Sequence, residues 1–159
     1  MRVLGIDPGT SLIGYGIVEI SGNQCRLMEY GVLKTGINIK NKDRVVEVYN
    51  FFDKLIKKFS PDKIAIESLF YFKNSKTVIN VSEIRGVLLL AASKNNIQTE
   101  EFTPLQVKQS VSSYGRAGKE QVQTMVKLIL HMKELPKPDD AADALAIAIC
   151  CANTLVYLK

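Results

Sequence analysis

The chain has 159 residues, of which 47% are hydrophobic and 23% charged, and its formal net charge is +5. A chain of this length suits one globular domain, which buries roughly 70% of its unfolded surface without disulfides or metals. Its apolar runs are shorter than the roughly 20 residues of a membrane helix, and the start MRVLGIDPG is not typical of an export signal. We therefore expect a single domain over residues 1–159, located in the cytoplasm and without a membrane partner.

The cysteines and the net charge narrow the class of protein only slightly. Cys25, Cys150 and Cys151 are odd in number and two of them are adjacent, which fits neither a disulfide framework nor zinc-site spacing. We expect them to be reduced thiols in the core, as in a cytoplasmic protein. The basic charge permits nucleic-acid binding but does not establish it.

The first part of the chain predicts an antiparallel meander followed by a helix. Three β-rich runs cover residues 2–7, 12–20 and 25–35, and turn residues separate them. Hydrophobic residues at helical spacing then predict a helix over 42–59, which Ser60-Pro61-Asp62 ends.

Strands and helices alternate in the rest of the chain. The expected elements are a strand over 63–67, a helix over 76–94, a strand over 97–102, a helical turn opened by Thr103-Pro104, a helix over 119–132 and a last helix from about Asp140. Three hairpin strands followed by this alternation indicate an α/β protein with a five-stranded mixed sheet flanked by helices.

Four acidic residues each interrupt an apolar element at its end. Asp7 closes the first strand in GIDPGT, and Glu67 closes the fourth in IAIES. Asp140 and Asp143 lie three apart on the last helix and therefore share one face. Taken singly, each also fits an ordinary role as a turn residue, a strand exit or a helix cap, and capping is the role we expect for Asp139.

Asp143 fits such an ordinary role least well. It lies beyond the cap position, and it is the only polar residue among the twelve from 141 to 152. A lone carboxylate among apolar side chains is costly unless it has a partner. Asp143 is therefore expected to face a compensating charge.

Several carboxylates brought together would repel one another, and a divalent cation removes that penalty. Oxygen ligands suit magnesium, with manganese as an acceptable substitute, and two such ions about 3.5–4 Å apart can cleave a phosphodiester. The only histidine is His131, at the end of a helix, where we expect a surface position. Without a histidine-activated nucleophile to compete, the residues predict a carboxylate–metal phosphodiesterase.

Four collinear motifs resemble the RuvC family of Holliday-junction resolvases. They are GIDPGT at the start, IES at 66–68 followed by Phe70 and Asn74, QVKQ at 106–109 and DAADALAIAI at 140–149. The resemblance covers residues 2 to about 152. It implies an RNase H-like fold, a homodimer, and magnesium-dependent, symmetric nicking of two opposed strands in a four-way DNA junction during recombination and repair. It also implies that Asp7, Glu67, Asp140 and Asp143 are the catalytic, metal-binding set, with two Mg²⁺ ions in each active site.

The resemblance further implies DNA contacts. Phe70 matches an aromatic position at the junction centre, and the neighbouring Tyr71, Lys73 and Lys76 extend that region; core packing is the alternative for Phe70. Lys108 and Lys119 match basic positions near the scissile strand, with plain solvation as the alternative. Arg116 has no matching position and is included as a candidate phosphate contact.

Residues 87–92, VLLLAA, are apolar on more sides than one core face needs. The resemblance implies that this helix forms the dimer interface, through Val87, Leu88 and Ala91, and burial against the sheet is the competing explanation. The resemblance also names the RuvA–RuvB branch-migration complex as a candidate partner.

Other functions fit the sequence less well. A sugar-kinase or actin-like ATPase shares only the GIDPGT motif and needs two such domains. A non-catalytic nucleic-acid-binding module of the same fold has no use for four carboxylates facing phosphates. A nearer rival is an RNase H-like nuclease of the YqgF type, which acts in RNA processing. The aromatic region around Phe70 and the DAADALAIAI helix favour the DNA resolvase.

Overall fold

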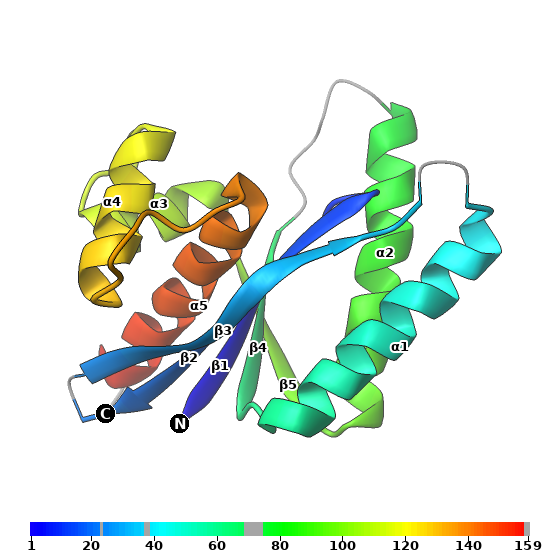
Figure 1. The fold of residues 1–159 in the computed structure, drawn as a ribbon, viewed down its shortest axis with the longest axis horizontal. Helices are drawn as coiled ribbons and strands as arrows, with labels where there is room; N and C mark the ends of the chain where they lie inside the picture. The colour runs from blue at the N-terminus through cyan, green and yellow to red at the C-terminus, as the bar shows by residue number, and fades with distance from the viewer. Residues whose placement is uncertain (23, 37–38, 69–74, 158–159) are drawn as a thin grey trace.

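The computed structural model describes residues 1–22, 24–36, 39–68 and 75–157, and in these ranges one five-stranded sheet is flanked by helices (Figure 1). The strands are β1 (Arg2–Asp7), β2 (Leu12–Ser21), β3 (Gln24–Lys34), β4 (Lys63–Glu67) and β5 (Gln98–Phe102). The helices are α1 (Asn41–Phe59), α2 (Ser75–Lys94), α3 (Pro104–Ser112), α4 (Lys119–Ile129) and α5 (Asp139–Tyr157).

The strand order across the sheet is β3-β2-β1-β4-β5. The first three strands pair antiparallel, whereas β4 pairs parallel with both β1 and β5. The predicted mixed sheet is therefore confirmed, including the meander and the later alternation. Because β1, β4 and β5 run in the same direction, their carboxyl ends lie at one edge of the sheet.

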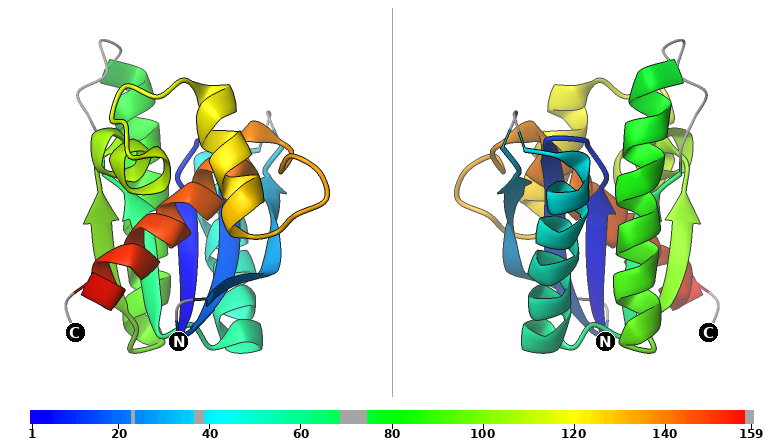
Figure 2. Two further views of the ribbon diagram at one scale, coloured as in Figure 1. Left: turned by 90° about the vertical axis from the view of Figure 1, so that its left-hand side faces the viewer. Right: turned by 90° about the vertical axis from the view of Figure 1, so that its right-hand side faces the viewer.

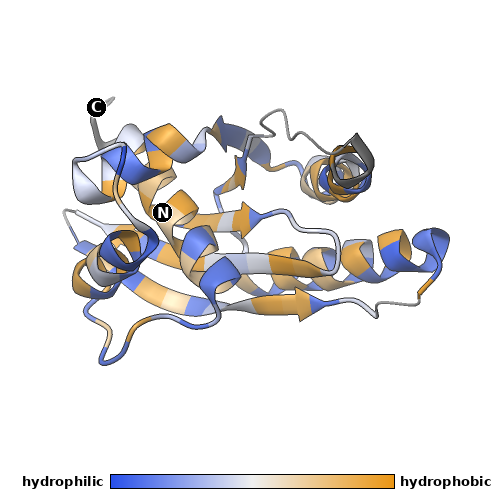
Figure 3. Ribbon diagram, turned by 90° about the horizontal axis from the view of Figure 1, so that it is seen from above, coloured by the Kyte–Doolittle hydropathy of each residue, from blue (hydrophilic) through white to orange (hydrophobic). Residues whose placement is uncertain are grey.

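Helices α1 and α2 cover one face of the sheet and run alongside its strands (Figure 2). Bulky aliphatic and aromatic side chains fill this interface. Its fully buried members include Leu4, Ile6, Ile64, Phe52 and Leu88. Seen from above, apolar residues follow the strands and helices, while the first turn of α1 is hydrophilic (Figure 3).

Helix α5 crosses the other face obliquely, and α3 and α4 pack on α5 (Figures 1 and 2). This helix lies unusually close to the strands. A Cβ atom at Gly5 of β1 would overlap the carbonyl oxygen of Ala144, and one at Gly14 of β2 would overlap that of Asp140. Glycines on the strands and alanines on the helix therefore let two backbones meet where side chains normally separate them.

The element bounds differ from the predictions mainly at helix ends. Thr103 caps α3 in a reciprocal capping box with Gln106, at the predicted start. The predicted single turn is a longer helix, which continues to Ser112. Helix α4 ends at Ile129 instead of residue 132, because the backbone of His131 is left-handed, with φ of 51°. His131 is exposed, as expected.

The cysteines lie in or beside the core, as the sequence predicts. Cys150 and Cys151 are buried free thiols, and Cys25 is a half-buried one. Within the described ranges, no helix combines the length and the apolar character that crossing a membrane requires.

Candidate active site

The parallel register of β1 and β4 brings Asp7 and Glu67 to the same level at the ends of these strands. Side chains alternate between the two faces of a strand. Gly5 and Ala65, two residues earlier on each strand, face α5, so Asp7 and Glu67 face it too. The sheet thus presents two carboxylates to the last helix.

The first two turns of α5 supply the other two carboxylates. Asp140 lies over Gly14, which pairs with Asp7 across the β1–β2 ladder. Asp143 follows one turn later on the same face of the helix. All four predicted acidic residues therefore come from the three elements that meet at the carboxyl edge of the sheet.

Electrostatics show how strongly the four carboxylates interact. Burial raises the pKa of Asp7 to about 7, and the charges of Glu67, Asp143 and Asp140 add to the increase. Burial, then the charge of Asp143, also raises the pKa of Glu67. Burial raises the pKa of Asp143, although Lys119 opposes this shift. The cluster thus holds more negative charge than the protein environment compensates.

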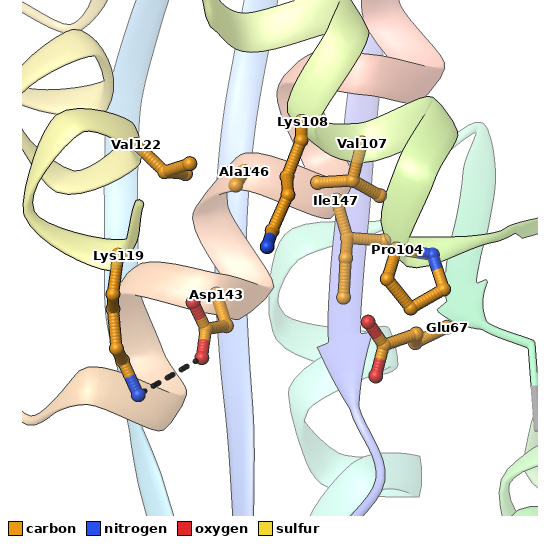
Figure 4. A pocket seen from close by; sticks show the side chains of 9 residues that line it. All are labelled: Glu67, Pro104, Val107, Lys108, Lys119, Val122, Asp143, Ala146 and Ile147. Atoms are coloured by element: carbon orange, nitrogen blue, oxygen red, sulfur yellow. Dashed lines mark ion pairs between the residues drawn. The ribbon is translucent and has the colours of Figure 1, made fainter. Parts of the chain in front are cut away.

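A cavity of about 210 Å³ opens beside Glu67 and Asp143, between α3, α4, α5 and β4 (Figure 4). Lys108 extends from α3 into this space, and it lowers the pKa of Glu67 against the effect of burial. Lys119, the first residue of α4, lies on the opposite side, and its Nζ is 3.5 Å from Asp143 Oδ2. The remaining lining is apolar and comprises Pro104, Val107, Val122, Ala146 and Ile147.

Asp139 does not cap α5, contrary to the sequence-based expectation. It is the first residue of the helix, and its side chain points to α4 instead of to its own backbone. Its Oδ2 lies 3.1 Å from Lys119 Nζ, and its Oδ1 accepts a 2.9 Å hydrogen bond from Gln123. Gln123 was not predicted as part of this site. Its spacing could have revealed it, because it lies four residues after Lys119 on the buried face of α4.

The donor set fits a divalent metal in its chemistry, because oxygen ligands of high charge density suit Mg²⁺ and Mn²⁺. The raised pKa values of Asp7, Glu67 and Asp143 indicate the same need for positive charge. The carboxylates do not yet form a coordination shell. Among the described residues, no three acidic, histidine or cysteine side chains are close enough to bind one ion together. Lys119 instead provides positive charge beside Asp143.

The other predicted DNA contacts are only partly described. Phe70, Tyr71 and Lys73 lie outside the described residues, and only the backbone of Lys76, in the first turn of α2, is described. Arg116 is exposed in the loop between α3 and α4, and it is not among the residues that line the cavity.

Two of the three predicted dimer contacts are buried within the protomer. Leu88 and Ala91 are 2% and 0% exposed, because they pack inside the protomer with α1 and the sheet, and Val87 is half-buried beside them. The surplus apolar character of 87–92 thus largely serves the core. The exposed apolar residues of α2 are Ile79 and Leu90, at 58% and 52%.

Fold and site define the class of protein. A mixed five-stranded sheet with strand order 3-2-1-4-5, and acidic residues from β1, β4 and α5 converging at its edge, is the arrangement of an RNase H-like nuclease.

Comparison with known proteins identifies the family. The family model described as crossover junction endodeoxyribonuclease RuvC matches residues 3–151. A protein of that name from Fusobacterium nucleatum is 52% identical over 155 residues, covering 98% of this chain and 82% of that protein. Another, from Ruminiclostridium cellulolyticum, is 53% identical over 154 residues, covering 97% and 93%. The chain therefore belongs to the RuvC family of crossover junction endodeoxyribonucleases.

A solved structure supports the same assignment. The structure of Thermus thermophilus RuvC in complex with a Holliday junction substrate has a TM-score of 0.95 and 34% sequence identity, covering 99% of this chain and 96% of that one. The protein is thus a DNA-binding nuclease that resolves Holliday junctions in recombination and repair, and its family depends on a divalent metal. These similarities favour neither the RNA-processing nuclease nor the non-catalytic module.

Proposed function

We propose that Asp7, Glu67, Asp140 and Asp143 form the catalytic centre and hold two Mg²⁺ ions, with Mn²⁺ as a substitute. The observation that carries this proposal is the convergence of four acidic residues, three of which have raised pKa values because burial and mutual repulsion disfavour their charge. Carboxylates are kept together in this way at a cost that a bound cation offsets. When bound, the metal would activate water and stabilise the leaving oxygen.

The chain's own residues would orient the scissile strand. Lys108 and Lys119 flank the cavity from α3 and α4, so a phosphate entering between them would meet positive charge on both sides. The N-terminus of α4, where Gly118 precedes Lys119, adds free backbone donors. The other predicted DNA contacts, which remain predictions, are Arg116, Lys76, Lys73, Tyr71 and Phe70.

We also propose that the protein acts as a homodimer, because two opposed strands of a junction require two active sites. With Leu88 and Ala91 buried in the protomer, the outer stripe of α2 is the better candidate surface. Ile79, Gly86 and Leu90 share this stripe at helical spacing, and all three are exposed. A Leu90→Glu variant should then sediment as a monomer and nick one strand at a time. Unchanged dimerisation would remove α2 from the interface.

A cytoplasmic location and the RuvA–RuvB complex as a partner remain predictions. The location rests on the cysteines, which are expected to be reduced, and the partner rests on the family resemblance.

A cleavage assay tests the catalytic assignment. A synthetic four-way junction, a matched linear duplex and an RNA–DNA hybrid would each be incubated with the protein, with and without Mg²⁺. The wild type should nick only the junction, symmetrically and only with metal. Asp143→Asn should lose more activity than the roughly 10–100-fold that removal of an outer-shell partner costs.

Two controls make the result specific. Asp43→Asn removes an exposed carboxylate from the first turn of α1 and should cut at the wild-type rate. Junction binding measured with Ca²⁺ should be retained by Asp143→Asn. If binding falls as much as cleavage does, the carboxylate is not catalytic, and equal cutting of the hybrid would overturn the choice of substrate.

A further inference from the structure

Two pairs of residues interlock between α4 and α5 at the edge of the acidic cluster. Lys119 and Gln123 are four apart on α4, and Asp139 and Asp143 are four apart on α5, so each pair shares one helix face. Lys119 Nζ lies 3.1 Å from Asp139 Oδ2 and 3.5 Å from Asp143 Oδ2. One ammonium group is therefore shared by a carboxylate of the proposed metal site and a carboxylate outside it.

Gln123 fixes the outer carboxylate in position. Its side chain is buried, at 9% exposure, and its amide nitrogen donates the 2.9 Å hydrogen bond to Asp139 Oδ1. A buried amide needs such a partner, so rotating Asp139 away would leave the donor unsatisfied. Gln123 thus holds one oxygen of Asp139, and Lys119 lies beside the other.

We propose that Asp139 is a positioning residue for the nuclease: it holds the Lys119 ammonium beside the acidic cluster and keeps it off Asp143 when a metal ion binds there. This inference rests on the proposed metal site. An ammonium paired with Asp143 alone would compete with the cation for that carboxylate. An ammonium with a second anionic partner can release Asp143 and still remain at the mouth of the cavity, where phosphate enters.

Metal titration without DNA tests this role directly. Mn²⁺ binding to the full-length protein would be followed by the signal of free Mn²⁺ in electron paramagnetic resonance. Asp139→Asn keeps an acceptor for Gln123 but removes the charge, so it should fold normally and bind Mn²⁺ roughly two- to fivefold more weakly, the size expected for one partly exposed ion pair. Asp139→Glu should restore affinity.

A double-mutant cycle separates positioning from a general field effect. Lys119→Gln should tighten Mn²⁺ binding, and adding Asp139→Asn to it should change nothing further. An equal loss with and without Lys119 would mean that Asp139 acts only as a nearby negative charge. Unchanged affinity in the single Asp139→Asn variant would overturn the proposal outright, as would Asp139→Glu behaving like Asp139→Asn.

The same titration distinguishes failure of the proposed metal site from failure of the positioning role of Asp139. If Asp143→Asn leaves Mn²⁺ binding unchanged, the proposed metal site fails, and the role of Asp139 fails with it. If Asp143→Asn abolishes binding while Asp139→Asn has no effect, the metal site stands and only the positioning role is lost.

Discussion

The two faces of the sheet are built on opposite principles. On the face of α1 and α2, large side chains such as Phe52 and Leu88 fill the space between the layers. On the face of α5, glycines and alanines remove that space, and the helix backbone rests almost on the strands. Bulky packing mainly supplies stability, whereas close approach supplies position: it brings Asp140 and Asp143 to the ends of β1 and β4.

The largest expected effect is on the bulky face. Leu88→Ala should lower the free energy of unfolding by about 2–5 kcal/mol, because it leaves a cavity between α2 and the sheet. Urea unfolding measures this loss, and junction cleavage per folded molecule should stay at the wild-type level. Because Leu88 is buried in the protomer, the dimer dissociation constant should not change either. A weakened dimer with normal protomer stability would reverse that placement.

On the α5 face, the clearest effect is electrostatic and depends on pH. The pKa of Asp7 rises from 3.8 to about 7 on folding, so the folded state binds the proton more tightly than the unfolded state. The metal-free fold therefore loses stability as pH rises from about 4 to about 7, and the loss is complete above that window. Asp7→Asn should then stabilise the metal-free protein by up to about 4 kcal/mol at pH 8.

Urea unfolding in a metal chelator at pH 4 and pH 8 checks this prediction. The stabilising effect should be nearly absent at the lower pH and should reverse when Mg²⁺ is added, because the wild type gains more from the metal. Equal effects at both pH values would show that burial does not perturb Asp7.

Close approach is tested by adding one methyl group. Gly14→Ala places a Cβ where the Asp140 carbonyl lies, so α5 must move away. The expected cost is about 1–3 kcal/mol in urea unfolding, as for other overpacked sites. Cleavage should fall even at temperatures where the variant is fully folded, because Asp140 and Asp143 move with the helix. Normal cleavage by the folded variant would show that the carboxylates tolerate a wider gap.

The smallest expected effect comes from substituting a glycine on the other face of the sheet, as a match to Gly14. Gly86 in α2 has open space where a Cβ would lie. Gly86→Ala should stabilise the protein by about 0.5–1 kcal/mol through helix propensity alone, without changing cleavage. A thermal melt measures it. Destabilisation would mean that the partner protomer of the proposed dimer approaches Gly86 closely enough to clash with the added methyl group.

The sequence predicted the sheet, the order of the elements and the residues of the acidic cluster, because each depends on local patterns. Strand alternation and helical spacing set the elements, and an acid at the end of an apolar run marks Asp7, Glu67 and Asp143. Interactions between distant elements were harder to predict. The pattern around Asp139 is that of a helix cap, and only its distance to α4 reveals its ion pair with Lys119.

The predicted dimer contacts also show that contacts between distant elements are hard to predict from sequence. The run VLLLAA shows that the helix is unusually apolar, but the sequence alone does not show which of its residues face α1. Leu88 and Ala91 fall on that inner face. Similarly, Gly5 and Gly14 look like ordinary strand residues until α5 is seen against them.

Helices α3 and α4 rest on α5, and this arrangement has a consequence for how the protein can vary. The acids are built on the sheet and α5, while Lys108 and Lys119 stand on a separate outer layer. A change of length in the loop at 113–118 would alter how an incoming strand meets Lys108, whereas the ion pairs of Lys119 with Asp139 and Asp143 keep α4 against α5. The contacts that receive a strand can therefore vary while the acidic cluster stays the same.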